Sequence, residues 1–223
     1  MKTFFLAISV LLNLFYSEVT FANELKINNA QELINFAKSV NSGNTYSAYT
    51  VYLDADIEFD STLSQQYVPI SKFLGIFNGK GHTISNLNVN ISSGHVGLFG
   101  YSTGLTVQNV IIDSSCSFIN RDDYNTYRFV GGFVSCCEGS SKTSSIENCV
   151  NMANIAITGN TDVDIGIGGL AGKMYYGSLI KNCANYGTII TSGVGKPVHI
   201  EDLLAISTST LEVSSIVSTT GKS

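Results

Sequence analysis

The chain has 223 residues, with 17 acidic and 12 basic side chains and a net charge of −5. Charged residues make up only 13% of it, 21 residues are glycine, and tryptophan is absent. The sequence contains no cluster of basic residues, so we expect no nucleic-acid partner and no polybasic membrane surface. The length suits one domain or one short array of repeats.

Residues 1–22 have the pattern of a secretory signal peptide. Lys2 precedes an apolar run from Phe4 to Phe15, and the small-residue pattern Thr-Phe-Ala predicts cleavage after Ala22. The apolar run is shorter than the roughly 20 residues of a membrane span, and no later segment supplies one. We therefore expect a protein of the secretory pathway, extracellular or at the cell surface, with no transmembrane segment in the mature chain.

The mature chain is predicted to begin with a helix. Asn29 can cap it, and apolar side chains recur at helical spacing from Leu33 to Val40, after which Gly43 ends it. We expect residues 23–45 to form an N-terminal capping helix segment. Beyond it, the periodicity changes to the alternation of a strand, followed by short β segments and glycines.

Two motifs recur along the rest of the chain. The run Ile-Glu-Asn-Cys-Val-Asn from Ile146 matches Ile-Lys-Asn-Cys-Ala-Asn from Ile180, 34 residues later, and looser copies begin at Ile84 and Val107. An apolar residue followed by glycine comes after each of the first three copies. The recurring residues are Asn86, Asn109, Asn148 and Asn182 in the first motif and Gly97, Gly131, Gly132, Gly168 and Gly169 in the second.

A repeat of this length cannot bury its own apolar face, so the units must stack with equivalent residues above one another. We expect the recurrent asparagines to form a ladder of side-chain amides at one corner. The glycines either let the backbone turn sharply or allow a close approach where a Cβ would clash. Residues 46–206 are therefore predicted to form an all-β solenoid.

The run from Phe73 to Leu87, with Phe-Asn-Gly-x-Gly-His-Thr-Ile-Ser-Asn-Leu at its end, resembles the GLUG-motif repeat proteins. So do Val-Gly-Leu-Phe-Gly at 96–100, the leading helix, Leu-Asp-Ala-Asp-Ile at 53–57 and Val-Pro-Ile at 68–70. The resemblance covers residues 24–200 and implies a right-handed parallel β-helix-like fold on secreted, surface or adhesin-type proteins. It supplies no catalytic residue, and such repeats also occur as accessory regions of surface peptidases.

Three carboxylates are the candidates for catalysis. Asp54, Asp56 and Glu58 fall on one face of an alternating strand, and β-helical polysaccharide lyases and hydrolases use clustered acids in this way. An ordinary solvated strand face shows the same alternation, and we favour that interpretation. The acids at 122–123 and 162–164 lie in variable insertions, where exposed loop acids are the expectation and a weak calcium site is the alternative, although neither segment has a known calcium-binding pattern.

No metal or cofactor site is predicted, because the three histidines, His82, His95 and His199, have no partner at metal-ligand spacing. No nucleophile motif of the Gly-x-Ser-x-Gly type occurs. Asn90-Ile91-Ser92 is an N-glycosylation sequon with Asn90 as the acceptor.

The five cysteines, an odd number, do not indicate a disulfide framework. Cys149 and Cys183 occupy equivalent repeat positions and are predicted to form a ladder of buried thiols, and Cys116 is aligned with the core position of Ile155. Strand spacing of about 4.8 Å is wider than the Cβ separation that a disulfide prefers, so Cys149 and Cys183 should stay reduced.

The glycine motif is lost after the fourth copy, and residues 207–223 are expected to be a Ser/Thr-rich tail or an incomplete coil. An unpaired strand edge would then remain, through which chains could self-associate. As to function, we expect a non-enzymatic repeat module that adheres to an extracellular glycan or protein. The alternatives are a carbohydrate-active β-helix enzyme and an accessory domain of a truncated surface peptidase.

Overall fold

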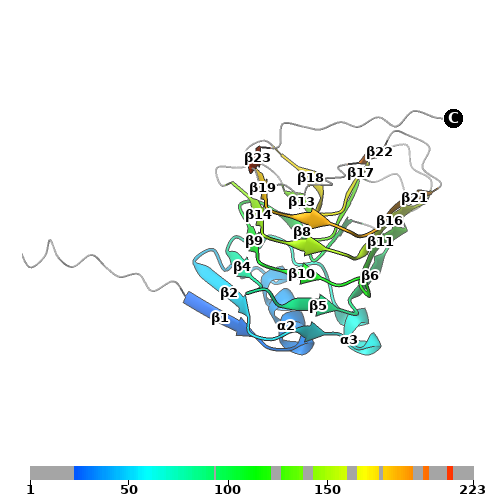
Figure 1. The fold of residues 1–223 in the computed structure, drawn as a ribbon. Coiled ribbons are helices and arrows are strands. Elements are labelled where there is room, and N and C mark those ends of the chain that lie inside the picture. The colour runs from blue at the N-terminus through cyan, green and yellow to red at the C-terminus, as the bar shows by residue number, and fades with distance from the viewer. Residues whose placement is uncertain are drawn as a thin grey trace, which may run out of the picture.

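A computed structural model describes residues 23–92, 94–121, 127–137, 143–159, 165–175, 178–192, 198–200 and 210–212. The described chain consists mainly of strands that form five sheets, with two helices near its start (Figure 1). All pairings between these strands are parallel except one near residue 210. The protein is therefore an all-β protein with parallel sheets. The expected signal peptide lies outside the described residues.

The chain visits the five sheets in the same order again and again, and we call one such round a pass. The first sheet contains β1 (Asn23–Ile27), β2 (Tyr49–Leu53), β4 (Ile76–Asn78), β9 (Thr106–Gln108), β14 (Ser145–Glu147), β19 (Leu179–Lys181) and β23 (Thr210–Glu212). The second contains β3 (Ile57–Glu58), β5 (Thr83–Ser85), β10 (Ile111–Ile112), β15 (Val150–Asn151) and β20 (Ala184–Asn185). The third contains β6 (Asn88–Ile91), β11 (Ser117–Arg121), β16 (Asn154–Thr158) and β21 (Ile189–Ser192). The fourth contains β7 (His95–Val96), β12 (Arg128–Gly131), β17 (Ile165–Gly168) and β22 (Val198–Ile200), and the fifth contains β8 (Phe99–Ser102), β13 (Val134–Cys137) and β18 (Ala171–Met174).

The helix α2 (Ala30–Asn41) forms where the sequence predicts it. The side chain of Asn29 accepts a hydrogen bond from the Glu32 amide over 3.0 Å, and Glu32 in turn accepts from the Asn28 amide over 2.7 Å. These bonds satisfy amides that a helix start leaves unpaired. The helix lies at the end of the stack where the described chain starts (Figure 1), and its Phe36 ring contacts the ring of Phe73.

The short helix α3 (Ser61–Gln66) takes the place of a third-sheet strand in the first pass. Asp60 caps it by accepting from the Leu63 amide over 2.7 Å. Ser64 hydrogen-bonds with both backbone groups of Asn88 in β6, so α3 covers this edge of the third sheet. A covered edge cannot pair with another chain.

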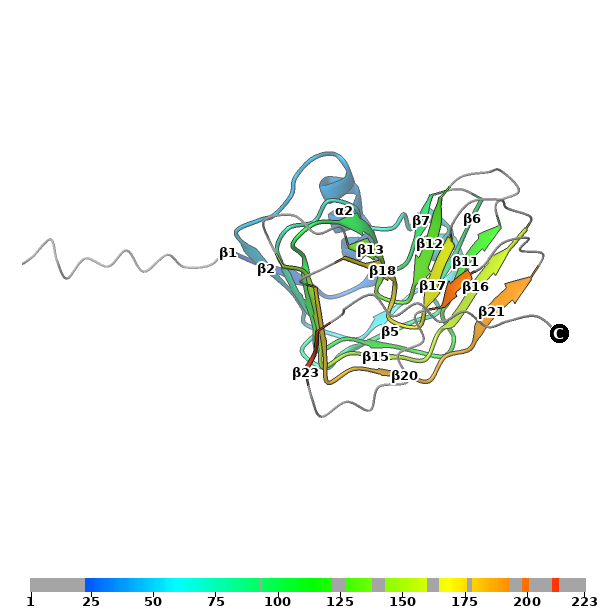
Figure 2. The ribbon, with the colours of Figure 1, turned by 90° about the horizontal axis from the view of Figure 1, so that it is seen from above.

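Side chains of successive passes stand in columns inside the molecule. In the first sheet Phe77, Val107, Ile146 and Ile180 are in register and buried. Figure 2 shows the passes from above, stacked around this shared interior. Because the interior positions are aligned, each pass buries its apolar face against the passes above and below it.

The first copy of the asparagine motif is placed differently from the prediction. Val107 pairs with Phe77 of the preceding pass, whereas Ile84 pairs with Ile112 in the second sheet. The copy at Ile84 is thus displaced by one sheet, and Asn86 is not part of the asparagine corner. This displacement explains why Gly97 follows Ile84 after only 13 residues but follows Phe77 after 20.

The alignment of Cys116 with Ile155 is also wrong. Phe118 pairs with Ile155, while the carbonyl of Cys116 accepts a hydrogen bond from the amide of Asn154. Cys116 is buried, as expected, but two residues before the aligned position. The gap between the two motifs varies in length from pass to pass, so equal spacing from the asparagine does not mean an equal place in the sheet.

One strand lies within the segment that is expected to be a Ser/Thr-rich tail or an incomplete coil. The strand β23, at residues 210–212, pairs antiparallel with β19, so this segment adds a strand to the first sheet. Residues 201–209 and 213–223 lie outside the described residues. The other four sheets end in the described chain at β20, β21, β22 and β18. Self-association through these edges stays a prediction. In the part of the chain that is described, no helix is long and apolar enough to cross a membrane.

Candidate functional site

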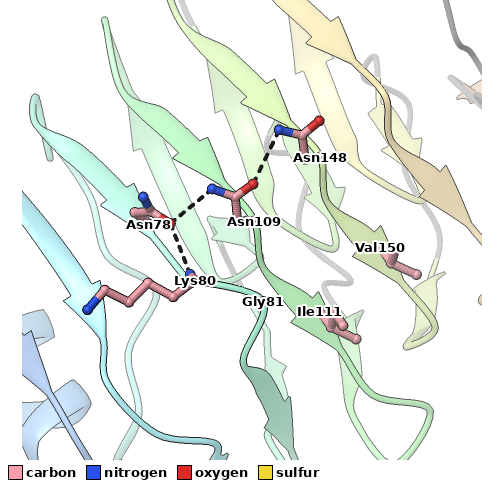
Figure 3. Close-up of a pocket in the computed structure, with 7 residues that line it drawn as sticks. All are labelled: Asn78, Lys80, Gly81, Asn109, Ile111, Asn148 and Val150. Atoms are coloured by element: carbon pink, nitrogen blue, oxygen red, sulfur yellow. Dashed lines mark hydrogen bonds between the residues drawn. The ribbon is translucent and has the colours of Figure 1, made fainter.

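Four asparagine side chains form a hydrogen-bonded row, the amide ladder, at the corner between the first and second sheets. Asn109 Nδ2 donates to Asn78 Oδ1 over 3.0 Å, Asn148 Nδ2 to Asn109 Oδ1 over 3.2 Å, and Asn182 Nδ2 to Asn148 Oδ1 over 3.1 Å. Figure 3 shows the first three of these residues. The predicted ladder is confirmed for three of its four members, and Asn78 stands where Asn86 was expected.

The backbone explains why asparagine recurs at this corner. Asn109, Asn148 and Asn182 have φ angles of 56°, 52° and 53°, in the left-handed region. Among residues with a side chain, asparagine enters this region at the lowest cost, because its short amide can hydrogen-bond locally. The corner therefore selects asparagine for its backbone, and stacking brings the amides into contact.

An open groove of about 550 Å³ runs beside the amide ladder. We call it the ladder groove. Its wall opposite the asparagines is made by Ile111 and Val150, which are neighbours in the second sheet and only partly exposed. The complete lining is Asn78, Lys80, Gly81, Asn109, Ile111, Asn148 and Val150 (Figure 3).

The amides of the ladder keep hydrogen-bonding capacity for a ligand. A side-chain amide has two N–H donors and an oxygen with two lone pairs. Within the ladder, Asn109 and Asn148 each use one donor and one lone pair. The described residues make no further hydrogen bond to these two amides. One donor and one acceptor of each can therefore serve a bound molecule.

The one cation of the groove is already paired. Lys80 Nζ lies 2.6 Å from Asp54 Oδ1 and 4.7 Å from the centre of the Tyr52 ring, while Lys26 approaches Asp54 Oδ2 to 3.2 Å. The hydrogen bond to Lys80, followed by that to Lys26, lowers the pKa of Asp54, and the same bond raises the pKa of Lys80. The groove therefore offers no unpaired charge to an anionic ligand.

The three carboxylates proposed for catalysis do not share a strand face. β2 ends at Leu53 and β3 begins at Ile57, so the chain turns a corner between them. Asp56 Oδ1 lies 3.1 Å from His82 Nδ1 and accepts from the Thr83 amide over 2.9 Å. Glu58 Oε1 accepts from Asn86 Nδ2 over 3.3 Å. Each carboxylate is bound to the next pass, so the prediction of a single acidic face is wrong.

For two of these acids the hydrogen bonds favour the ionised form, which does not suit the general acid of a glycosidase. The bond from the Thr83 amide, and then that from His82, lowers the pKa of Asp56, and the pKa of Asp54 is lowered too. A glycosidase needs one carboxyl whose pKa is raised, so that it can donate a proton to the leaving group. Asp54 and Asp56 are instead held as carboxylates by their partners.

The described chain contains a serine–histidine contact that sequence analysis missed. His95 Nδ1 lies 3.0 Å from Ser135 Oγ, which donates its proton to the carbonyl of Phe129 over 2.7 Å. Because the hydroxyl proton is used there, Ser135 accepts from His95, the reverse of a nucleophile and its base. Ser135 is also fully buried. The two residues are 40 positions apart and belong to different passes, so no local motif could reveal them.

Metal ligation finds no support in the described part of the chain, where no group of three or more His, Cys, Asp or Glu side chains is placed to hold an ion. His82 is bound to Asp56, and the side chain of His199 and the acids at 122–123 and 162–164 lie outside what is described. Asn90 of the sequon is exposed on β6, beside an open hollow formed with Ile91, Ser92 and Arg121.

The recurrent glycines lie at the turn between the fourth and fifth sheets, where they provide space. None of Gly97, Gly131, Gly132, Gly168 or Gly169 has a positive φ. A Cβ on Gly132 would lie 2.5 Å from the Gly169 oxygen and 2.8 Å from the side chain of Asn151. Of the two explanations given by the sequence, close approach is therefore the correct one.

Asn151 itself belongs to a second, internal amide row. It is fully buried, and its Nδ2 donates to Asn185 Oδ1 over 2.8 Å. This row is built from the second asparagine of each Ile-x-Asn-Cys-x-Asn copy, whereas only the first was predicted to form a ladder. The equal recurrence of both asparagines was the signal that could have identified this row.

No protein-family model matches the chain, and no curated protein matches it. Among solved structures, it is similar to a Bacteroides ovatus protein described as a "putative immunoglobulin A1 protease". The match has 15% sequence identity and a TM-score of 0.38, and covers 91% of this chain and 83% of the other. At these values the likeness carries no conclusion about this chain's activity.

Proposed function

We propose that this chain is a secreted or cell-surface module without catalytic activity that binds an extracellular glycan along the ladder groove. The signal-peptide pattern of residues 1–22 supports export. The proposal also includes a right-handed parallel β-helix with α2 as its N-terminal cap, of the kind that GLUG-motif repeats imply. The constant order of the sheets supports it, and connections between parallel strands of one sheet are nearly always right-handed.

The observation that carries the binding proposal is the outward amide ladder. It presents one amide per pass, and passes repeat at the strand spacing of about 4.8 Å. A ligand that runs along the stack would thus meet a donor and an acceptor at regular intervals, with Ile111 and Val150 packing against its apolar faces. An extended, uncharged chain rich in hydroxyl groups fits this combination, since Lys80 is neutralised by Asp54.

Binding of the purified mature chain to an array of neutral polysaccharides and to matrix proteins tests the proposal. We expect glycan binding that Asn109→Gly weakens at least tenfold. This variant keeps a left-handed backbone but removes the central amide. The matched control is Asn86→Gly, because Asn86 also has a positive φ of 58° and is exposed, but lies at the next corner.

Three results would count against the proposal. If the chain binds no glycan on the array, glycans are not its ligands. If Asn109→Gly and Asn86→Gly weaken glycan binding equally, the ladder groove is not the binding site. Shortened products from any polysaccharide would contradict the absence of catalysis.

A further inference from the structure

Another hollow, of about 550 Å³, is formed by the loop that runs from Gly43 to Tyr49 between α2 and β2. The loop enters β2 at Tyr49, whereas the acid–lysine contacts beside the ladder groove follow the other end of this strand at Leu53. The two sites therefore lie at opposite ends of the first sheet's strands. None of the residues that line the hollow is an acid, a lysine, an arginine or a histidine.

The loop holds a tyrosine in an unfavourable backbone conformation. Tyr46 has a φ of 52°, in the left-handed region that bulky residues rarely adopt. Such a conformation persists only where the surroundings enforce it, and it is commonest at ligand-binding and active sites. Here the Tyr46 ring contacts Phe36 at 5.2 Å and Tyr49 at 5.1 Å between centroids, and the hydroxyl lies 2.9 Å from Ser39 Oγ.

Further bonds fix the rest of the loop. The carbonyl of Tyr46 accepts from the Tyr49 amide over 3.0 Å, and that of Thr45 accepts from the Leu74 amide over 2.9 Å. Asn44 Nδ2 donates to Ser39 Oγ over 2.9 Å. The loop also lies directly on Gly75, where a Cβ would come within 2.7 Å of the Tyr49 carbonyl oxygen. The two rings are thus positioned before any ligand arrives, which lowers the entropic cost of binding.

From this geometry we infer that the loop is a second binding site, for a single neutral sugar ring. Tyr46 and Tyr49 are both partly exposed and offer aromatic surface to the apolar face of a sugar. The amide of Asn44 and the hydroxyls of Thr45 and Ser47 are the few polar groups that fix orientation in a small-molecule site. An ionic ligand would lose its hydration without gaining a counter-charge, so the site selects uncharged sugars.

The test is a titration of the ¹⁵N-labelled mature chain with the methyl glycosides of glucose, galactose and mannose and with N-acetylglucosamine. We expect at least one of them to shift the amides from Gly43 to Tyr49 at concentrations up to about 50 mM, where a millimolar Kd is detectable. Ala48→Trp should abolish the shifts, because Ala48 is exposed and a bulky side chain there fills the hollow. Gln65→Trp, at an exposed site on α3, should leave them unchanged.

Tyr46→Asn provides a second variant, since asparagine tolerates the left-handed backbone but has no ring. It should weaken sugar binding at the loop at least fivefold. The inference is overturned if no sugar shifts this loop or if Ala48→Trp still binds. Asn109→Gly should leave sugar binding at the loop unchanged. A failure of this inference can therefore be distinguished from a failure of the ladder-groove proposal.

Discussion

Asn148 donates a hydrogen bond from its side chain to the side chain of Asn109, 39 residues earlier, over 3.2 Å. Both residues have left-handed backbones, and both lie at the same corner of consecutive passes. The position thus makes two demands, a positive φ and an amide. Glycine meets only the first demand and alanine meets neither, so a pair of substitutions can separate them.

We predict that Asn148→Ala destabilises the protein more than Asn148→Gly. Loss of the exposed ladder bonds of Asn148 should cost at most about 1 kcal/mol in either variant. Alanine should cost about 1–2 kcal/mol more, because its Cβ opposes the left-handed conformation. Urea unfolding of the two variants measures the difference, and equal free energies of unfolding would show that the backbone does not select asparagine here.

Gly132→Ala should be among the most damaging single substitutions. Its Cβ would collide with the Gly169 oxygen and the buried Asn151, so the turn between two sheets must shift, at a cost of about 3 kcal/mol or more. Gly81→Ala is the control: Gly81 has a φ of 85° and open space around it, so only the backbone cost of about 1–2 kcal/mol applies. Similar melting temperatures for the two variants would contradict the close approach.

Acid should weaken the folded state through Asp54 and Asp56. Both have a folded-state pKa below the ordinary value of 3.8, so their contribution is present above that value and is lost as the pH falls through the lowered pKa. Urea midpoints measured from neutral pH down to about pH 2 should therefore decrease below about pH 4.

Asp56→Asn should make this acid decrease smaller, because the side chain no longer takes up a proton. The control is Thr62→Ser, an exposed substitution without a titratable group, which should leave the acid decrease as it is in the unmodified chain. An unchanged decrease in Asp56→Asn would mean that the bonds to Thr83 and His82 do not contribute.

The thiols should be unreactive in the folded protein. All five cysteines are free and buried, and burial raises the pKa of Cys116 to about 11 and that of Cys137 to about 12. Burial likewise raises the pKa of Cys149. Since the thiolate is the reactive form, iodoacetamide at neutral pH should not label Cys116, Cys137 or Cys149 until urea exposes them. The hydrogen bond with Cys149 lowers the pKa of Cys183, so that thiol is protected by its burial alone.

Cys149 and Cys183 lie one pass apart, and the Cys149 amide donates to Cys183 Sγ over 3.4 Å. We predict that they stay reduced in the folded chain, because adjacent strands hold them farther apart than a disulfide prefers. Mass spectrometry of unreduced protein decides this point. A disulfide-linked peptide containing both residues would disprove it.

Features set by neighbouring residues could be predicted from the sequence. The capped helix α2, the left-handed asparagines and the inward apolar columns each depend on a few consecutive residues. For the same reason the amide ladder could be predicted at Asn109, Asn148 and Asn182, where the motif recurs almost unchanged. Its fourth member could not, because Asn78 departs from the motif: it directly follows Phe77, is in register with Gln108 and has no positive φ, and only the strand pairing brings it beside Asn109.

The sequence by itself determined that this chain consists of stacked β units with buried thiols, because apolar alternation and recurring asparagines are local properties of the chain. The tertiary structure decided which residues of different passes meet. It separated Asp54 from Glu58 by a corner, moved Cys116 out of line with Ile155, and placed β23 against β19. The physical reason is that register is settled by packing between passes whose connections differ in length, and a single strand's pattern fits several registers equally well.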